Sequence, residues 1–174
     1  MNLSKSELKE FLDEKYDLYN RPEFIANDPI SIPHIFTRKE DIEISGFLTA
    51  TISWGNRKSI INNARKLIRL MDDVPYDFIT NFENPDLRRF QKFVHRTFNG
   101  NDCIYFLKSL KNIYQNHSGL EAVFNHKINN GGNIIDSINY LNQIFFELDH
   151  PQRIRKHIAN PLKKASAKRI NMFL

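Results

Sequence analysis

The chain contains 174 residues, of which 41% are hydrophobic and 26% are charged, so we expect one soluble globular domain and exclude a disordered protein. A single cysteine, Cys103, excludes an internal disulfide, and no run of about 18 apolar residues could cross a membrane. These features predict a cytoplasmic protein with no membrane-spanning segment. Because the sequence has no cysteine pair and no histidines at the spacing of metal ligands, we also expect no metal or cofactor.

The formal net charge of +5 arises at the C-terminal end of the chain. Residues 150–174 contain seven lysines and arginines and no carboxylate. Like charges at this density repel one another in a folded chain unless an anion offsets them or solvent surrounds them. Nucleic acid is the commonest polyanion of this kind, so the segment predicts nucleic-acid binding; a solvated basic surface and an acidic protein partner are the alternatives. The seven residues are Arg153, Arg155, Lys156, Lys163, Lys164, Lys168 and Arg169.

Capping signals place the first helices. Ser4 and Glu7 have the spacing of a capping box, so a helix is expected to begin there. Residues 21–36 contain three prolines without a steady apolar period, which predicts an extended surface loop. Thr37 and Glu40 repeat the capping-box spacing ahead of a nearly apolar stretch, which predicts a central, buried helix ending near residue 55.

The third predicted helix is capped by Asn56 and has apolar residues at the helical period through Met71. Lys58, Arg65 and Arg69 fall on its outer face, and no acidic residue lies nearby in the sequence. This face is either a second basic patch that contacts nucleic acid or an ordinary solvated helix surface.

The second half of the chain continues the helical pattern. A short helix is expected over residues 75–81, a longer one from Asp102, a brief one capped by Ser118, and another after the turn at residues 129–132, with Ile134 and Ile135 facing inward. Residues 84–100 show no clear pattern. Because few segments alternate with period two, the sequence predicts an all-α fold.

The basic segment reads as two helices joined by a hairpin. Asp149 is the expected N-cap of the first, residues 162–166 form the connection, and Ser166 is the expected cap of a second helix that begins near Ala167. Lys168 and Arg169 then fall in the first helical turn, where the helix dipole disfavours cations. This conflict predicts a bound anion such as a phosphate.

The run from Leu162 to Leu174 resembles the hairpin and following helix of the helix-hairpin-helix DNA glycosylases. Nearly the whole chain is similar to an uncharacterised bacterial protein family that is distantly similar to that superfamily. The stretches that carry this similarity are residues 22–24, 47–58 (including Ser53-Trp54-Gly55-Asn56-Arg57), 95–98 and 162–174. The resemblance implies a DNA-glycosylase-like helical fold with a helix-hairpin-helix in residues 150–174, which grips duplex DNA and extrudes a damaged base for repair.

By this resemblance, the nucleophilic lysine that forms a Schiff base with the sugar falls on Lys168; contact with a phosphate, or exposure to solvent, is the alternative. Trp54 is expected in the core, with base stacking as the alternative, and His95 is expected to be structural rather than a base or a phosphate contact. The residues expected to contact nucleic acid are Arg153, Arg155, Lys156, Lys163, Lys164, Ser166, Arg169, Asn56, Arg57 and Lys58.

The chain departs from the glycosylase pattern in two places. Its hairpin has Lys164, Ala165 and Ser166 where active relatives place glycines, and the sequence ends before the position of their essential aspartate. We therefore expect residues 1–174 to be one helical domain and a truncated part of a longer protein that performs base excision. The alternatives are a non-catalytic nucleic-acid-binding module and a helical interaction protein with an acidic partner.

Overall fold

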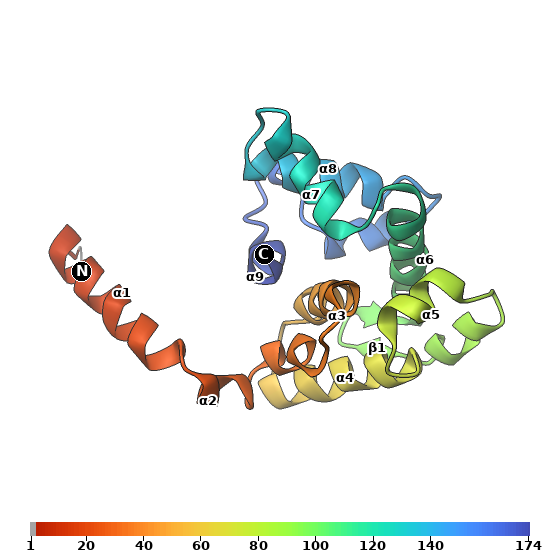
Figure 1. The fold of residues 1–174 in the computed structure, drawn as a ribbon, viewed down its shortest axis with the longest axis horizontal. Coiled ribbons are helices and arrows are strands. Elements are labelled where there is room, and N and C mark those ends of the chain that lie inside the picture. Colours follow the sequence, from red (N-terminus) through yellow and green to blue (C-terminus); the bar gives the residue numbers. More distant parts are fainter. Residues whose placement is uncertain (1–2) are drawn as a thin grey trace.

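The computed structural model describes residues 3–174, and most of them are helical, which confirms the all-α class (Figure 1). The α-helices are α1 (Lys5–Tyr19), α2 (Pro22–Ile25), α3 (Lys39–Thr51), α4 (Arg57–Leu70), α5 (Pro75–Asn81), α6 (Gly100–Asn116), α7 (Leu120–Asn129), α8 (Ile134–Phe145) and α9 (Lys168–Phe173). The 3₁₀ helices are η1 (Pro29–Ser31), η2 (Pro33–Ile35), η3 (Asp86–Phe90), η4 (Gln152–His157) and η5 (Pro161–Lys163), and the strands are β1 (Val94–His95) and β2 (Phe98–Asn99). Within residues 3–174, no helix is both long and apolar enough to span a membrane.

Helix α1 begins where the sequence predicts. The Ser4 hydroxyl accepts a hydrogen bond from the Glu7 N–H, and the Glu7 carboxylate accepts one from the Ser4 N–H at 2.8 Å, so the capping box is confirmed. None of the residues of α1 is buried, and the helix extends away from the rest of the molecule (Figure 1). Its apolar face is therefore largely uncovered by the rest of the described chain.

Residues 21–36 are more ordered than the predicted extended loop. Pro22, Pro29 and Pro33 stand at the first turns of α2, η1 and η2. Proline suits this position because its fixed φ is helical and its missing N–H would have no intrahelical partner. The prolines that predicted a loop instead start three short helical turns, and Ile32 between them is fully buried.

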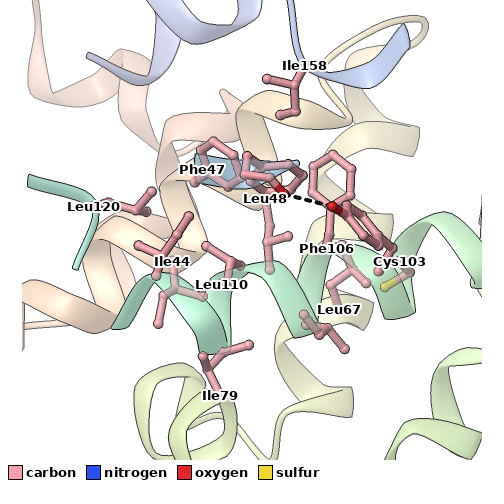
Figure 2. Packing of buried hydrophobic residues seen from close by; sticks show 14 of the residues in the cluster. Ile44, Phe47, Leu48, Leu67, Ile79, Cys103, Phe106, Leu110, Leu120 and Ile158 are labelled. Atoms are coloured by element: carbon pink, nitrogen blue, oxygen red, sulfur yellow. Dashed lines mark hydrogen bonds between the residues drawn. The ribbon is translucent and has the colours of Figure 1, made fainter. Parts of the chain in front are cut away.

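Helix α3 is the buried central helix that the sequence predicts, but its N-cap is Arg38 rather than Thr37, without a side-chain cap, and the helix ends at Thr51. Figure 2 shows side chains of α3 packed against those of α6. The aromatic rings of Phe47, Phe106 and Phe145 meet there, with centroids 4.6 Å apart for Phe106 and Phe145. Burial of such large rings supplies much of the core's stability.

Helix α4 also confirms its prediction. The Asn56 side-chain oxygen accepts a hydrogen bond from the Ser59 N–H at 3.2 Å, which caps the helix. Its predicted inward face is buried or, at Ile61, partly buried, while Lys58, Arg65 and Arg69 are exposed. The amphipathic period therefore identified both faces correctly.

Residues 84–100 form η3 and a small antiparallel hairpin, in which Val94 pairs with Asn99 and His95 with Phe98. Asn99 then caps α6 and forms a capping box with Asp102, so the expected helix start at Asp102 is wrong by two residues. Gly100 is required here, because a Cβ at this position would lie 2.1 Å from the Gln91 carbonyl oxygen. Asp102 therefore lies in the first turn of α6, where it is fully buried.

Helices α7 and α8 pack against each other. The expected cap at Ser118 is wrong: the N-cap is Gly119, and both residues have positive φ, 61° for Ser118 and 97° for Gly119. Asn133 caps α8, and Ile134 and Ile135 are exposed rather than inward-facing. Both isoleucines lie in the first turn of α8, while the buried residues of that helix begin at Ser137.

The basic C-terminal segment differs most from its prediction. Instead of an α-helix capped by Asp149, it has two 3₁₀ turns, and the N-cap of η4 is Pro151. Ser166 does not cap α9; the N-cap is Ala167, in the left-handed conformation with φ 52° and no side-chain hydrogen bond. Short α9 packs on α3, where the Phe173 and Phe47 rings lie 5.5 Å apart. A helix-hairpin-helix therefore stays a hypothesis for this segment.

Candidate nucleic-acid interface

A cleft with a volume of about 730 Å³ lies between the end of α3, the start of α4, the η4–η5 segment and α9. Its walls contain five cationic side chains and no aspartate or glutamate. We call it the basic cleft. The five cationic residues are Arg155, Lys156, Lys163, Lys168 and Arg169. The fold therefore gathers most of the predicted C-terminal basic residues into one concave surface.

Four of these cations, all except Arg169, are available to an anion. They are exposed, and no ion pair joins any of them to a carboxylate in residues 3–174. Ser166 lines the cleft beside them and brings a hydroxyl. Lys164 is also exposed, in the left-handed conformation with φ 60°, but does not line the cleft. An anion in the cleft would meet unpaired positive charge.

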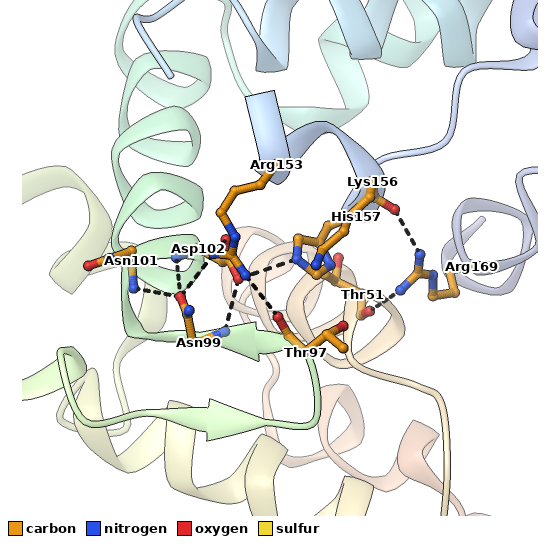
Figure 3. A network of polar contacts seen from close by, with 9 residues as sticks. All are labelled: Thr51, Thr97, Asn99, Asn101, Asp102, Arg153, Lys156, His157 and Arg169. Carbon is orange, nitrogen blue, oxygen red and sulfur yellow. Dashed lines mark hydrogen bonds and ion pairs between the residues drawn. The ribbon is translucent and has the colours of Figure 1, made fainter. Parts of the chain in front are cut away.

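Arg169 is held by the protein rather than presented to solvent. Its guanidinium donates hydrogen bonds to the carbonyl oxygens of Thr51 at 3.1 Å and Lys156 at 3.4 Å (Figure 3). It also lies 4.8 Å from the centre of the Trp54 ring, and burial lowers the pKa of this half-buried arginine. Because arginine stays protonated under such a shift, Arg169 links α9 to the end of α3 as a cation.

Trp54 forms part of the cleft wall and is already in contact with protein groups. Besides the guanidinium of Arg169, the His157 ring stacks on it with centroids 6.0 Å apart and planes at 22°. His95 meets it edge to face at 5.3 Å. These neighbours favour the expected packing role of Trp54 over stacking on a base.

Arg153 points to a buried carboxylate instead of the cleft. Its guanidinium forms an ion pair with Asp102 at 2.5 Å and also donates to Asn99 and to the Thr97 carbonyl, each at 3.3 Å (Figure 3). Asp102 is fully buried, so Arg153 compensates a charge that water cannot reach. This network fastens η4 to the start of α6.

Asp102 also faces His157, whose Nε2 lies 3.3 Å from the carboxylate but has no hydrogen-bond partner among the described residues. Burial lowers the pKa of His157 to about 4, although the Asp102 charge acts in the opposite direction. His157 is therefore neutral at pH 7 and adds no charge to the cleft that it lines. Sequence reasoning missed this pair, because an aspartate near a helix start is usually only a cap.

The three predicted contacts at the start of α4 lie outside the basic cleft. Asn56 uses its side-chain oxygen as the helix cap. Arg57 approaches Asp28 at 3.8 Å and lies 5.4 Å from the centre of the Phe24 ring, while Lys58 is exposed. Of this loop, Gly55 lines the cleft, and the side chain of Arg96 lies against it.

His95 is a structural residue, as expected. It is buried, its Nε2 bonds to the Trp54 carbonyl at 3.1 Å, and its Nδ1 bonds to the Asn63 amide at 3.1 Å. Because Asn63 uses its N–H₂ group, Nδ1 accepts and the neutral ring donates from Nε2. Both ring nitrogens are satisfied, which leaves His95 no capacity to act on a ligand.

The chemistry available in the basic cleft is anion binding. Lys168 lines it as an exposed amine, but no carboxylate stands in the cleft to act as an acid or base. Residues 3–174 also contain no cluster of three or more histidine, cysteine or acidic side chains that could hold a metal ion. The cleft therefore presents cations, a hydroxyl and backbone groups to an anionic ligand.

Comparison with known proteins identifies one family. Residues 28–174 match the model of a family described as "Protein of unknown function (DUF2400)". No curated protein and no solved structure matches the chain. The matched region includes every residue of the basic cleft and leaves out α1. Because the match covers most of its length, the chain belongs to the uncharacterised DUF2400 family.

Proposed function

We propose that this protein binds duplex DNA through the basic cleft. The observation that carries the proposal is a concave surface lined by five cationic residues and no carboxylate. A protein surface with this charge arrangement attracts phosphate groups, and binding releases the counterions condensed on the nucleic acid. The family resemblance of residues 162–174 to the hairpin of DNA glycosylases supports DNA over an acidic protein as the polyanion.

Within this proposal the cationic residues divide into two groups. Arg155, Lys156, Lys163 and Lys168 are exposed in the cleft and contact phosphates, and Lys164 adds charge outside it. The remaining arginines, Arg153 and Arg169, hold the segment in place through internal hydrogen bonds. Phosphate contacts position a protein on DNA without reading its sequence, so we expect affinity for duplexes of any sequence.

A charge reversal inside the cleft tests the proposal. The variant Lys163→Glu with Lys168→Glu should bind a fluorescent duplex much more weakly than the unmodified protein in an anisotropy titration. The slope of log affinity against log salt should flatten by about 0.9 for each phosphate that the variant no longer neutralises. Circular dichroism would establish that the variant is folded, since both lysines are exposed.

The matched control is Lys92→Glu with Lys108→Glu, which makes the same change in net charge at exposed positions outside the cleft. It should keep most of the affinity. Equal weakening in the two double variants would mean that net charge rather than the cleft governs binding. Unchanged affinity in the cleft variant would refute the proposal, and preference for a single strand would exclude duplex DNA as the ligand.

Base excision is a narrower hypothesis, which the resemblance to DNA glycosylases suggests. Lys168 occupies the position that the resemblance assigns to the nucleophile, and it lines the cleft. A lysine nucleophile also needs a group that moves protons at the sugar. Because no carboxylate lines the cleft, we assign DNA binding without base excision to residues 3–174.

A further inference from the structure

Helix α1 carries an apolar face that, apart from a contact between Tyr19 and Phe24, no other part of residues 3–174 covers. Six apolar or aromatic residues of this 15-residue helix are exposed by 45% to 64%. Isolated helices of this length are marginally stable in water, and most helices gain their stability by packing an apolar face. The six residues are Leu8, Phe11, Leu12, Tyr16, Leu18 and Tyr19. Helix α1 therefore needs a surface on which to pack.

The lysines and carboxylates of α1 lie on different faces of the helix, although Lys9 pairs with Asp13 at 2.5 Å and Lys15 with Glu14 at 2.6 Å. Lys15 lies at helical spacing with Leu8, Phe11, Leu12 and Tyr19, so it stands within the apolar face. Its ammonium lies 5.1 Å from the centre of the Phe11 ring. The other two lysines, at positions 5 and 9, fall at the edge of the same face, and all five carboxylates are on the opposite side. The face that needs a partner is therefore apolar and carries three lysines, two of which pair with carboxylates of the same helix.

A groove with the complementary character lies on the body of the molecule. It has a volume of about 680 Å³ and is formed by η1, η2, α3, α7 and α9. Exposed apolar side chains, including Ile30, Ile42 and Met172, line it. Its charged residues are the carboxylates Asp28, Glu43 and Glu121, and no lysine or arginine lines it. We call it the apolar groove.

The cations that pair with the carboxylates of this groove lie outside the groove. Lys39 forms an ion pair with Glu121 and approaches Glu43 at 3.8 Å, and Arg57 approaches Asp28 at 3.8 Å. Neither cation lines the groove. A helix that brings lysines on an apolar face would therefore meet apolar walls and carboxylates together. The acidic face of the same helix would remain in water.

Because of its direction, α1 cannot pack in the apolar groove of its own chain. The Arg21 guanidinium donates to the Asp17 carbonyl at 2.5 Å, and the Tyr19 and Phe24 rings pack edge to face at 5.4 Å. Arg57 of α4 lies over the Phe24 ring, so this junction is tied to the body. Figure 1 shows α1 running outward from the junction. A second copy of the chain can reach it without breaking these contacts.

We propose that two copies of this chain form a dimer in which α1 of each copy lies in the apolar groove of the other. The exchange makes two identical contacts related by a two-fold axis, which closes the assembly. The proposal does not depend on DNA binding. Since α1 lies outside residues 28–174, the dimer would be a property of this chain beyond the matched family region.

Paired variants of the full chain test the proposal by light scattering coupled to size exclusion. Leu8→Asp with Leu12→Asp changes the exposed apolar face of α1, and Ile30→Asp with Ile42→Asp changes the exposed lining of the groove. The unmodified protein should run with the mass of a dimer, and each double variant should run as a monomer. The matched control, Glu10→Ala with Asp17→Ala on the opposite face of α1, should remain dimeric.

Other outcomes would overturn the proposal. A monomeric unmodified protein at every concentration would exclude the exchange, and a dimer that survives the α1 variant would place the interface elsewhere. A dimer that is abolished in the α1 variant but retained in the groove variant would exclude the groove as its site. The α1 variant should still bind duplex DNA with unchanged affinity, so failure of the dimer and failure of DNA binding are distinguishable.

Discussion

The guanidinium of Arg153 lies 2.5 Å from the carboxylate of Asp102, although the two residues are 51 positions apart in the sequence. Asp102 is fully buried at the start of α6, whereas the Arg153 side chain is 43% exposed. Arg153, a partly exposed residue of the basic segment, therefore compensates the buried charge of Asp102. This ion pair attaches the segment to the core and so determines where its other cations lie.

Removing the carboxylate should destabilise the protein. In Asp102→Asn, Arg153 loses its charged partner, and the loss of hydrogen bonds to a charged group typically costs about 2 kcal/mol of unfolding free energy. Urea unfolding followed by circular dichroism measures the change. Asp149→Asn, at an exposed position without an ion pair in the described chain, should stay within about 0.5 kcal/mol of the unmodified protein. Equal stability of the two variants would mean that the pair contributes nothing.

Stability should also fall in mild acid because of His157. Burial lowers its pKa from 6.5 to about 4 in the folded protein, with Asp102, Lys156 and Arg169 as its charged neighbours. Between these values the unfolded chain binds a proton that the folded chain does not, so the unfolding free energy decreases as pH falls. The contribution of His157 is on the order of 3 kcal/mol, complete near pH 4.

The variant His157→Gln isolates this contribution. It lacks the titrating ring, so the difference in unfolding free energy between the two proteins should change with pH only from about 6.5 down to about 4. Urea unfolding at a series of pH values gives that difference. A constant difference across the series would show that His157 titrates alike in the folded and unfolded states.

Residues 1–174 should bind abasic duplex DNA without forming a covalent adduct. The cleft has an exposed lysine, Lys168, but no carboxylate to move protons at the sugar. Borohydride reduction followed by denaturing electrophoresis would reveal a trapped Schiff base. An adduct that forms with the unmodified chain and disappears in Lys168→Ala would contradict this prediction and assign lyase chemistry to the cleft.

Local signals predicted the helices better than their ends. The caps at Ser4 and Asn56 depend only on a side chain and groups three residues further along the chain, and both are confirmed. The caps expected at Ser118 and Ser166 failed because the residues that enter those helices, Gly119 and Ala167, have positive φ. Backbone conformations of this kind depend on how neighbouring elements pack, which the local sequence pattern does not contain.

The sequence predicted the charge of the candidate site but not the arrangement of its residues. The density of cations in residues 150–174 indicated an anion-binding surface, and the fold gathers Lys156, Lys163 and Lys168 in one cleft. Nothing in the pattern separated these from Arg153 and Arg169, which serve as anchors. Their partners, Asp102 and Thr51, are 51 and 118 positions away, and such distant contacts form only in the folded chain.

The anchoring of the basic segment limits how it can be dissected. A synthetic peptide of residues 150–174 would keep all seven cations but would lack the Asp102 and Thr51 anchors and the cleft wall that contains Trp54 and Ile60. Free in water, its like charges would drive the lysines apart. Such a peptide would behave as a generic polycation, so its affinity for DNA would say little about the intact protein.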